Sequence, residues 1–170
     1  MKKLFFIIFF LAATGSVMAQ NYAYVDMEYI LNKIPSYTNA QKQLEQLASQ
    51  YQKEIENKHS VIANMYSDYQ KQSSSLSSTV RKQKEDLIIS SEKEYKALQK
   101  KYFGPDGIMS QKRESLVKPI QENVNKSIQA IAVQKGYAVI FNKTEESVIV
   151  YTNPAYDVSN LVLAKLGINN

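Results

Sequence analysis

The sequence predicts a mostly helical α+β protein in which a long helical hairpin is joined to a small body that holds the strands. The chain has 170 residues but only 5 Gly and 4 Pro, so we expect a single domain with few helix-breaking positions. Apolar residues recur at helical spacing through the middle of the chain, whereas strand-like runs of Tyr, Val and Ile lie near its ends.

The first 19 residues are typical of a secretory signal peptide. Met1-Lys2-Lys3 precedes a ten-residue apolar run, Leu4 to Ala13, and small residues precede Gln20. A membrane anchor is the alternative, but the run is shorter than the roughly 20 residues that a membrane span needs. We therefore expect export from the cytoplasm and cleavage after Ala19.

The segment Asn21 to Asp26 predicts a short strand, because Tyr and Val favour a pleated surface. Asp26 can cap a short helix from Met27 to Lys33, which Pro35 ends.

A long helix is expected next, since no Gly or Pro occurs from Thr38 to about Leu76. An apolar seam runs through it with a mean spacing of about 3.6 residues, the period of an almost straight helix. The seam consists of Ala40, Leu44, Leu47, Tyr51, Ile55, Lys58, Ile62, Met65, Tyr69, Gln72 and Leu76.

The serine-rich run 73–79 favours a turn, because serine hydroxyls compete for backbone groups. Two helices joined by a polar turn form a helical hairpin, here an arm that covers residues 37–118 and is on the order of 60 Å long. The seam resumes on the returning helix at Val80, Lys84, Leu87, Ser91, Tyr95, Leu98 and Tyr102.

Gly104-Pro105-Asp106-Gly107 should interrupt the returning helix with a loop or kink. A helical stripe follows up to Lys135, and Gly136 ends it. The apolar runs 137–141 and 148–151 then predict a β-hairpin around the polar segment 142–147.

A last helix is expected from Val158 to Leu166, capped by Asp157 and closed by Gly167. Residues 20–36 and 119–170 thus hold all the expected strands, and a core of about 70 residues is marginal alone. We therefore expect this body to complete its core with other copies of the chain. The candidate oligomerisation residues are Tyr24, Val25, Val139, Phe141, Val148 and Val150.

Composition excludes most kinds of catalytic site. The chain has no Cys, so it has no disulfide, thiolate metal site, cysteine nucleophile or lipidated cysteine. Its one histidine, His59, excludes a two-histidine metal site, and no nucleophile elbow or glycine-rich phosphate loop occurs. We predict no catalytic residue, no cofactor and no metal. The net charge of +5 is too small to indicate nucleic acid, and export argues against that partner.

The returning helix carries a basic bias. Residues 81–118 contain ten Lys or Arg and six acidic residues. This is either an ordinary solvated helix surface or a surface that attracts acidic partners or anionic lipid over a long range.

Five segments make the chain resemble the Skp/OmpH family of periplasmic chaperones. Ala23-Tyr24-Val25-Asp26-Met27 with Ile30 to Pro35 resembles the family's opening. Residues 101–107, 118–121 and 135–141 resemble its Bacteroidetes-type members, and the likeness runs from about residue 22 to residue 167.

The resemblance implies a jellyfish-like homotrimer in the periplasm, in which each chain adds strands to a shared body and one arm. It also implies an ATP-independent holdase that keeps unfolded outer-membrane proteins soluble until they are inserted. An anionic lipid or lipopolysaccharide surface is a further partner class. The alternatives are a structural or tethering coiled-coil protein with one folded envelope partner, and a protein that docks on anionic lipid. The candidate client contacts are Tyr66, Tyr69, Leu76, Arg81, Lys82 and Lys84.

Overall fold

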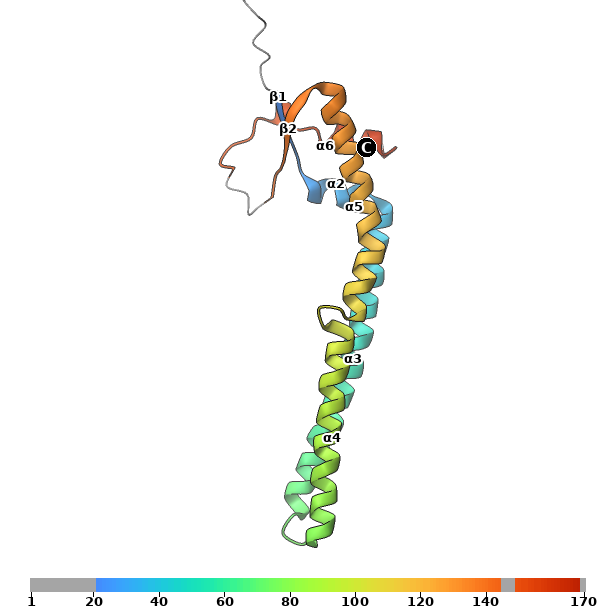
Figure 1. The fold of residues 1–170 in the computed structure, drawn as a ribbon, viewed down its shortest axis with the longest axis vertical. Coiled ribbons are helices and arrows are strands. Elements are labelled where there is room, and N and C mark those ends of the chain that lie inside the picture. The colour runs from blue at the N-terminus through green and yellow to red at the C-terminus, as the bar shows by residue number, and fades with distance from the viewer. Residues whose placement is uncertain (1–20, 145–148, 169–170) are drawn as a thin grey trace, which may run out of the picture. The chain divides into compact units, whose positions relative to one another are not determined.

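The computed structural model describes residues 21–144 and 149–168, and this part of the chain is mostly helical with a small parallel sheet of two strands (Figure 1). It divides into two compact units. Unit 1 contains the described residues up to Ile30 and from Asn125 onward, and unit 2 is Leu31–Val124. The expected signal peptide lies outside the described residues. No helix within those residues is both long enough and apolar enough to span a bilayer.

The sheet of unit 1 is built from β1 (Asn21–Val25) and β2 (Tyr137–Asn142), which run parallel. The pairing register places Ala23 opposite Ile140 and Tyr24 opposite Phe141. On the other side of β1, the backbone N–H of Val158 donates to the carbonyl of Tyr24 at 2.9 Å. Because β1 is held along both edges, its last three residues are buried.

The expected β-hairpin at 137–151 is wrong. Its first strand forms as β2, but it pairs with β1, and Ile149 to Tyr151 belong to no strand. Val148 lies outside the described residues. Pairing with β1 gives β2 a ladder of backbone hydrogen bonds within unit 1, whereas Val150 is 100% exposed and gains no packing within the chain.

The short helix α2 spans Met27–Lys33, as predicted. The Asp26 carboxylate accepts a hydrogen bond of 2.8 Å from the backbone N–H of Tyr29, the contact expected of an N-cap. Pro35 has two roles, since it prevents α2 from continuing and is also the first residue of α3 (Pro35–Gln72).

Helix α3 forms a helical hairpin with α4 (Ser78–Phe103), and the first part of α5 (Ile108–Lys135) also runs beside α3 (Figure 1). The serine-rich turn is residues 73–77, and the Ser77 hydroxyl accepts from the N–H of Val80 to cap α4. The predicted seam on α3 is confirmed by the buried residues Ala40, Leu44, Ile55 and Ile62.

The remaining elements are η1 (Pro154–Tyr156) and α6 (Ser159–Lys165). The Asp157 carboxylate accepts from the N–H of Ser159 at 2.8 Å, but the N-cap of α6 is Val158, one residue later than predicted. Val162 and Leu163 of α6 are buried in the core of unit 1. Helix α5 continues through Pro119 and ends before Gly136, whose φ is 68°.

Candidate functional site

A stacked pair of tyrosines holds α3 and α4 together at the end of the hairpin that is farther from the turn at residues 73–77. The rings of Tyr51 and Tyr102 lie 3.9 Å apart and are inclined by 7°. The Tyr102 hydroxyl donates to the Glu54 carboxylate at 2.8 Å, and this hydrogen bond raises the pKa of Tyr102. Aromatic stacking and a polar contact therefore join the two helices at the same level.

Tyr66 and Tyr69 make the same kind of contact nearer the tip. The Tyr66 hydroxyl donates to Glu92 at 2.8 Å, and the Tyr69 hydroxyl donates to Glu85. Each hydrogen bond to a carboxylate raises the pKa of the tyrosine concerned. Both residues are candidate client contacts. Their hydroxyl groups form hydrogen bonds between the two helices of the hairpin, whereas the Tyr66 ring is exposed.

The candidate residues around the tip differ in how available they are. The Arg81 guanidinium donates to the carbonyl of Ser73 at 2.8 Å, so it closes the turn between α3 and α4. Leu76 and Lys84 are half-buried, whereas Lys82 is exposed. Among Arg81, Lys82 and Lys84, Lys82 is therefore the residue that is exposed and takes no part in closing the turn.

The predicted seam on α4 is partly wrong. Ile88 is 3% exposed and packs inside the hairpin, whereas the predicted Leu87 is 59% exposed. Ile88, Tyr95 and Tyr102 are seven residues apart, so the inner side of α4 follows a heptad spacing. Because residues 87–89 are all apolar, the sequence pattern did not indicate which of them faces α3.

Exposed apolar side chains therefore lie along the hairpin surface. Five residues outside the buried seam share this property: Val61, Val80, Leu87, Ile89 and Phe103. They are spread over both helices among polar and charged neighbours. Sequence reasoning selected Tyr66 as a contact residue but missed Val61, Ile89 and Phe103.

The turn between α4 and α5 requires both of its glycines. A Cβ atom on Gly104 would lie 2.4 Å from the carbonyl oxygen of Lys100. A Cβ atom on Gly107 would lie 2.9 Å from the backbone of Gly104 and of Tyr102. The interruption expected at residues 104–107 is thus a tight turn in which backbone packs on backbone. A groove of about 480 Å³ lies against it, lined by Ala97, Lys100, Lys101, Gly104, Pro105, Asp106, Gly107, Ile108 and Gln111.

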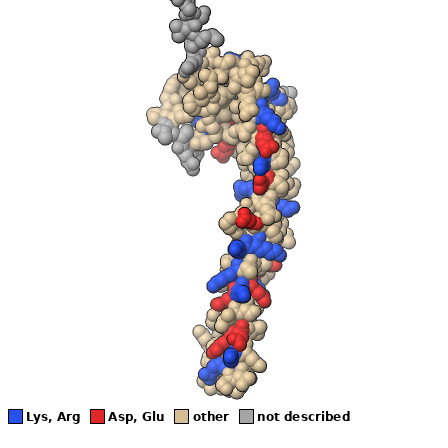
Figure 2. Space-filling model, viewed as in Figure 1, with Lys and Arg blue, Asp and Glu red and all other residues tan. Residues whose placement is uncertain are grey.

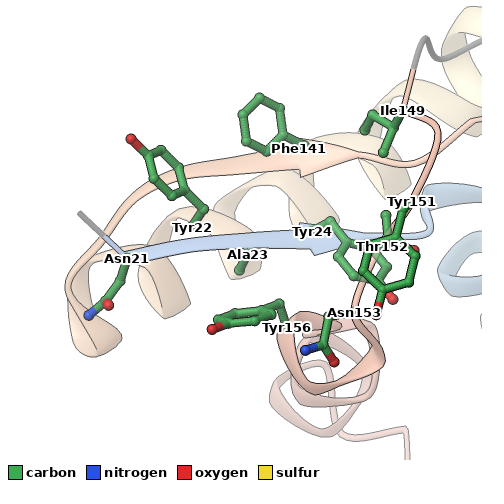
Figure 3. A pocket seen from close by; sticks show the side chains of 10 residues that line it. All are labelled: Asn21, Tyr22, Ala23, Tyr24, Phe141, Ile149, Tyr151, Thr152, Asn153 and Tyr156. Carbon is green, nitrogen blue, oxygen red and sulfur yellow. The ribbon is translucent and has the colours of Figure 1, made fainter. Parts of the chain in front are cut away.

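Unit 1 contains an open aromatic groove of about 490 Å³. Figure 3 shows the side chains of β1, β2 and residues 149–156 around it, among them Tyr22, Phe141 and Tyr156. The ring centres of Tyr22 and Phe141 are 6.3 Å apart. Strand β2 is thus paired on one edge but leaves much of its apolar surface uncovered.

The candidate oligomerisation residues divide into two groups. Tyr24 and Val25 are buried within the single chain, whereas Val139, Phe141 and Val150 are exposed. Val148 lies outside the described residues. Val139 and Phe141 of the exposed group belong to β2, and Val150 belongs to the segment that follows this strand.

The described residues contain no group of three or more His, Asp or Glu that could hold a metal ion. His59 is exposed, and its ring centre lies 5.6 Å from that of Tyr95. Its position is that of a surface residue of α3, as the sequence predicts.

Comparison with known proteins identifies the family. The model of the family "Outer membrane protein (OmpH-like)" matches residues 21–166. The fold is similar to a crystal structure of an OmpH-like protein from Caulobacter crescentus described as an outer membrane chaperone, with a TM-score of 0.64, 11% sequence identity, and coverage of 85% of this chain and 82% of that chain. A search of curated proteins found no significant match.

The narrower Bacteroidetes-type assignment is not supported, since the family match does not distinguish such members and the similar structure comes from Caulobacter crescentus. The family match covers most of the chain, including both strands, the hairpin and all of α6. The chain therefore belongs to the OmpH/Skp family of outer membrane chaperones, which are not enzymes.

Proposed function

We propose that this protein is an ATP-independent periplasmic holdase that binds unfolded outer-membrane proteins, keeps them soluble and delivers them for membrane insertion. The observation that carries the proposal is the surface of the hairpin, where Val61, Leu87 and Ile89 are exposed on helices that are otherwise polar. Membership of the OmpH/Skp family supports it. The signal-like residues before Gln20 support export.

Holding an unfolded chain needs many weak contacts and no covalent chemistry. Each buried CH₂ group contributes about 0.8 kcal/mol, so scattered apolar side chains can bind many different apolar segments without strong selection. A protein that binds the unfolded state lowers the concentration of free unfolded chains by mass action, without using ATP. Separate polar stretches between these side chains leave the client able to dissociate.

We also propose that unit 1 assembles into the homotrimer that the family resemblance implies. Phe141 and Tyr151 are exposed around an aromatic groove of about 490 Å³, and Val139 of the same strand is also exposed, which supports contact with further copies of the chain. Apolar strand surface left uncovered in one chain is stabilised when another chain covers it.

The test is an aggregation assay in which a urea-unfolded outer-membrane β-barrel protein is diluted into buffer without ATP. The protein should suppress light scattering at a near-stoichiometric ratio of trimer to client. Replacing Val61 and Leu87 by Ser should weaken suppression severalfold, because it removes one exposed apolar side chain from each helix. The matched control replaces the exposed Ala63 of α3 and the exposed Thr79 of α4 by Ser and should retain suppression.

Lack of suppression by the wild-type protein would contradict the holdase proposal. Binding to one folded envelope protein, without binding to unrelated unfolded ones, would favour the tethering alternative. Binding to anionic liposomes in the absence of any client would favour the lipid-docking alternative.

A further inference from the structure

Within the described residues no Lys or Arg of α4 forms an ion pair, and three carboxylates of that helix contact α3 instead. Glu85 and Glu92 accept hydrogen bonds from tyrosines of α3, and Glu94 forms an ion pair of 2.7 Å with Lys58. These carboxylates are thereby committed to the interface between α3 and α4. They are not paired with the lysines of their own helix.

The second half of α4 carries four lysines with no ion-pair partner in residues 21–144 and 149–168, and one of them, Lys101, lies over the Tyr102 ring at 5.4 Å from its centre. The ion pairs in that part of the chain are Lys58–Glu94 and Lys118–Glu114. Lys93, Lys96 and Lys100 are all exposed. Figure 2 shows Lys and Arg side chains gathered on this stretch of α4, close to the turn that joins it to α5.

Lys93 and Lys100 lie on the side of α4 that is turned away from α3, and Lys96 lies on the flank between that side and the inward side. Tyr95 and Tyr102 mark the inward side, since both contact α3 residues. Lys93 and Lys100 each precede one of these tyrosines by two residues, a rotation of about 200° at 100° per residue. Lys96 lies between them, about 4.5 Å along the axis from Lys93 and about 6 Å from Lys100, so each neighbouring pair is closer along the axis than the Debye length of about 8 Å.

This group of lysines continues into the groove at the turn between α4 and α5. Lys100 and Lys101 line that groove together with Ala97, Pro105, Asp106 and Ile108. Phe103, in the last turn of α4, is exposed nearby in the sequence. Positive charge and a mostly aliphatic hollow thus lie next to each other.

We propose that Lys93, Lys96 and Lys100, with the groove beside Gly104–Gly107, form the docking surface for acidic segments of unfolded clients. We call these three lysines the outer lysine group. Its unpaired positive charge is complementary to a chain segment with several carboxylates, and the groove accepts an apolar side chain next to them. The inference rests on the proposed holdase function and moves the initial contact from the tip residues Arg81 and Lys84 to the second half of α4.

The test compares two triple variants that remove the same charge from different helices. The first is Lys93→Gln, Lys96→Gln and Lys100→Gln. The control is Lys42→Gln, Lys53→Gln and Lys71→Gln on α3, where all three lysines are exposed and Lys71 lies in the last turn as Lys100 does in α4. Gln and Lys have similar helix propensities, so both variants should fold, and circular dichroism checks this.

Stopped-flow association is measured with an acidic unfolded outer-membrane protein over a series of salt concentrations. The outer lysine variant should associate about five- to tenfold more slowly at low salt, with a weaker salt dependence, because steering by local charge is lost. The control should stay within about twofold of wild type. Aggregation suppression at high salt should be equal for all three proteins.

Equal slowing in both variants would overturn the proposal, since only net charge would then matter. Loss of binding to vesicles of anionic phospholipid, with unchanged client association, would also overturn it and assign the surface to lipid. If the wild-type protein does not suppress aggregation at any salt concentration, the proposed holdase function itself fails. The assay therefore separates the two failures.

Discussion

The two units of this chain differ in how completely they bury their apolar side chains. Unit 2 buries a narrow seam between α3 and α4 and provides partners for three tyrosine hydroxyls. Unit 1 buries Val25 and Leu163 but leaves Phe141 and Val139 uncovered around an open groove. The hairpin is therefore nearly complete as a single chain, whereas the strand-bearing unit gains most from contact with a second copy.

The largest expected effect tests this difference in unit 1. Replacing Phe141, which is 48% exposed, by Asp should dissociate the oligomer, because an unpaired charge would enter an apolar contact. The chain should keep its helical content, since the side chain is not buried within one copy. Light scattering measures the mass and circular dichroism measures the helix. An unchanged mass would mean that β2 is not part of the assembly surface. Lys143→Asp, at an exposed site, serves as the control.

The next prediction sharpens the description of the hairpin seam. Ile88→Ala should lower the free energy of unfolding by about 2–4 kcal/mol, because it removes buried methyl groups and leaves a cavity. Leu87→Ala should change it by less than about 0.5 kcal/mol, since that side chain is exposed. Urea denaturation measures both. Comparable losses in the two variants would mean that Leu87 also packs in the assembled protein.

A smaller loss is expected at the turn between α4 and α5. Gly107→Ala would place a Cβ atom 2.9 Å from backbone atoms, so the turn must shift, at a cost of about 1–3 kcal/mol. Pro105→Ala, at an exposed position in the same turn, should cost less than about 1 kcal/mol. Thermal melts followed by circular dichroism compare the two variants. If Gly107→Ala melts at the wild-type temperature, the close backbone approach is not required.

The smallest effect concerns pH. Hydrogen bonds to carboxylates raise the pKa of Tyr66, Tyr69 and Tyr102 above the usual value of 10.0. The phenol donates only while protonated, so its stabilising contribution is complete below pH 10.0 and disappears as the pH rises through the raised pKa. Urea unfolding of the wild type should weaken over that alkaline range. The triple Tyr→Phe variant should start slightly less stable and lose less.

Local patterns predicted the helices better than they predicted the pairing of strands. Helix α2, the serine turn and the interruption at Gly104 depend on caps, prolines and glycines that act within a few residues. The pairing of β2 with β1 depends on segments more than 100 residues apart, and adjacency in sequence favoured the wrong partner, 148–151. Contacts across space decide such pairings, and the apolar runs alone do not encode which one forms.

The candidate site was predictable in its chemistry but not in its geometry. The excess of basic residues in 81–118 is visible in the sequence. The lysines of α4 form no ion pair in the described residues, while three carboxylates of that helix turn toward α3 to meet Tyr66, Tyr69 and Lys58. That choice follows from the level at which the two helices face each other, which a single helical pattern does not specify.

The turn at Gly104–Gly107 also bears on how this hairpin can change length during evolution. One inserted residue in a continuous helix rotates everything beyond it by about 100° and misplaces every later side chain. Helix α3 is unbroken from Pro35 to Gln72, but its neighbours α4 and α5 meet at a non-helical turn. That turn can absorb a mismatch, so α4 can lengthen or shorten with α3 near the tip while α5 keeps its rotational phase.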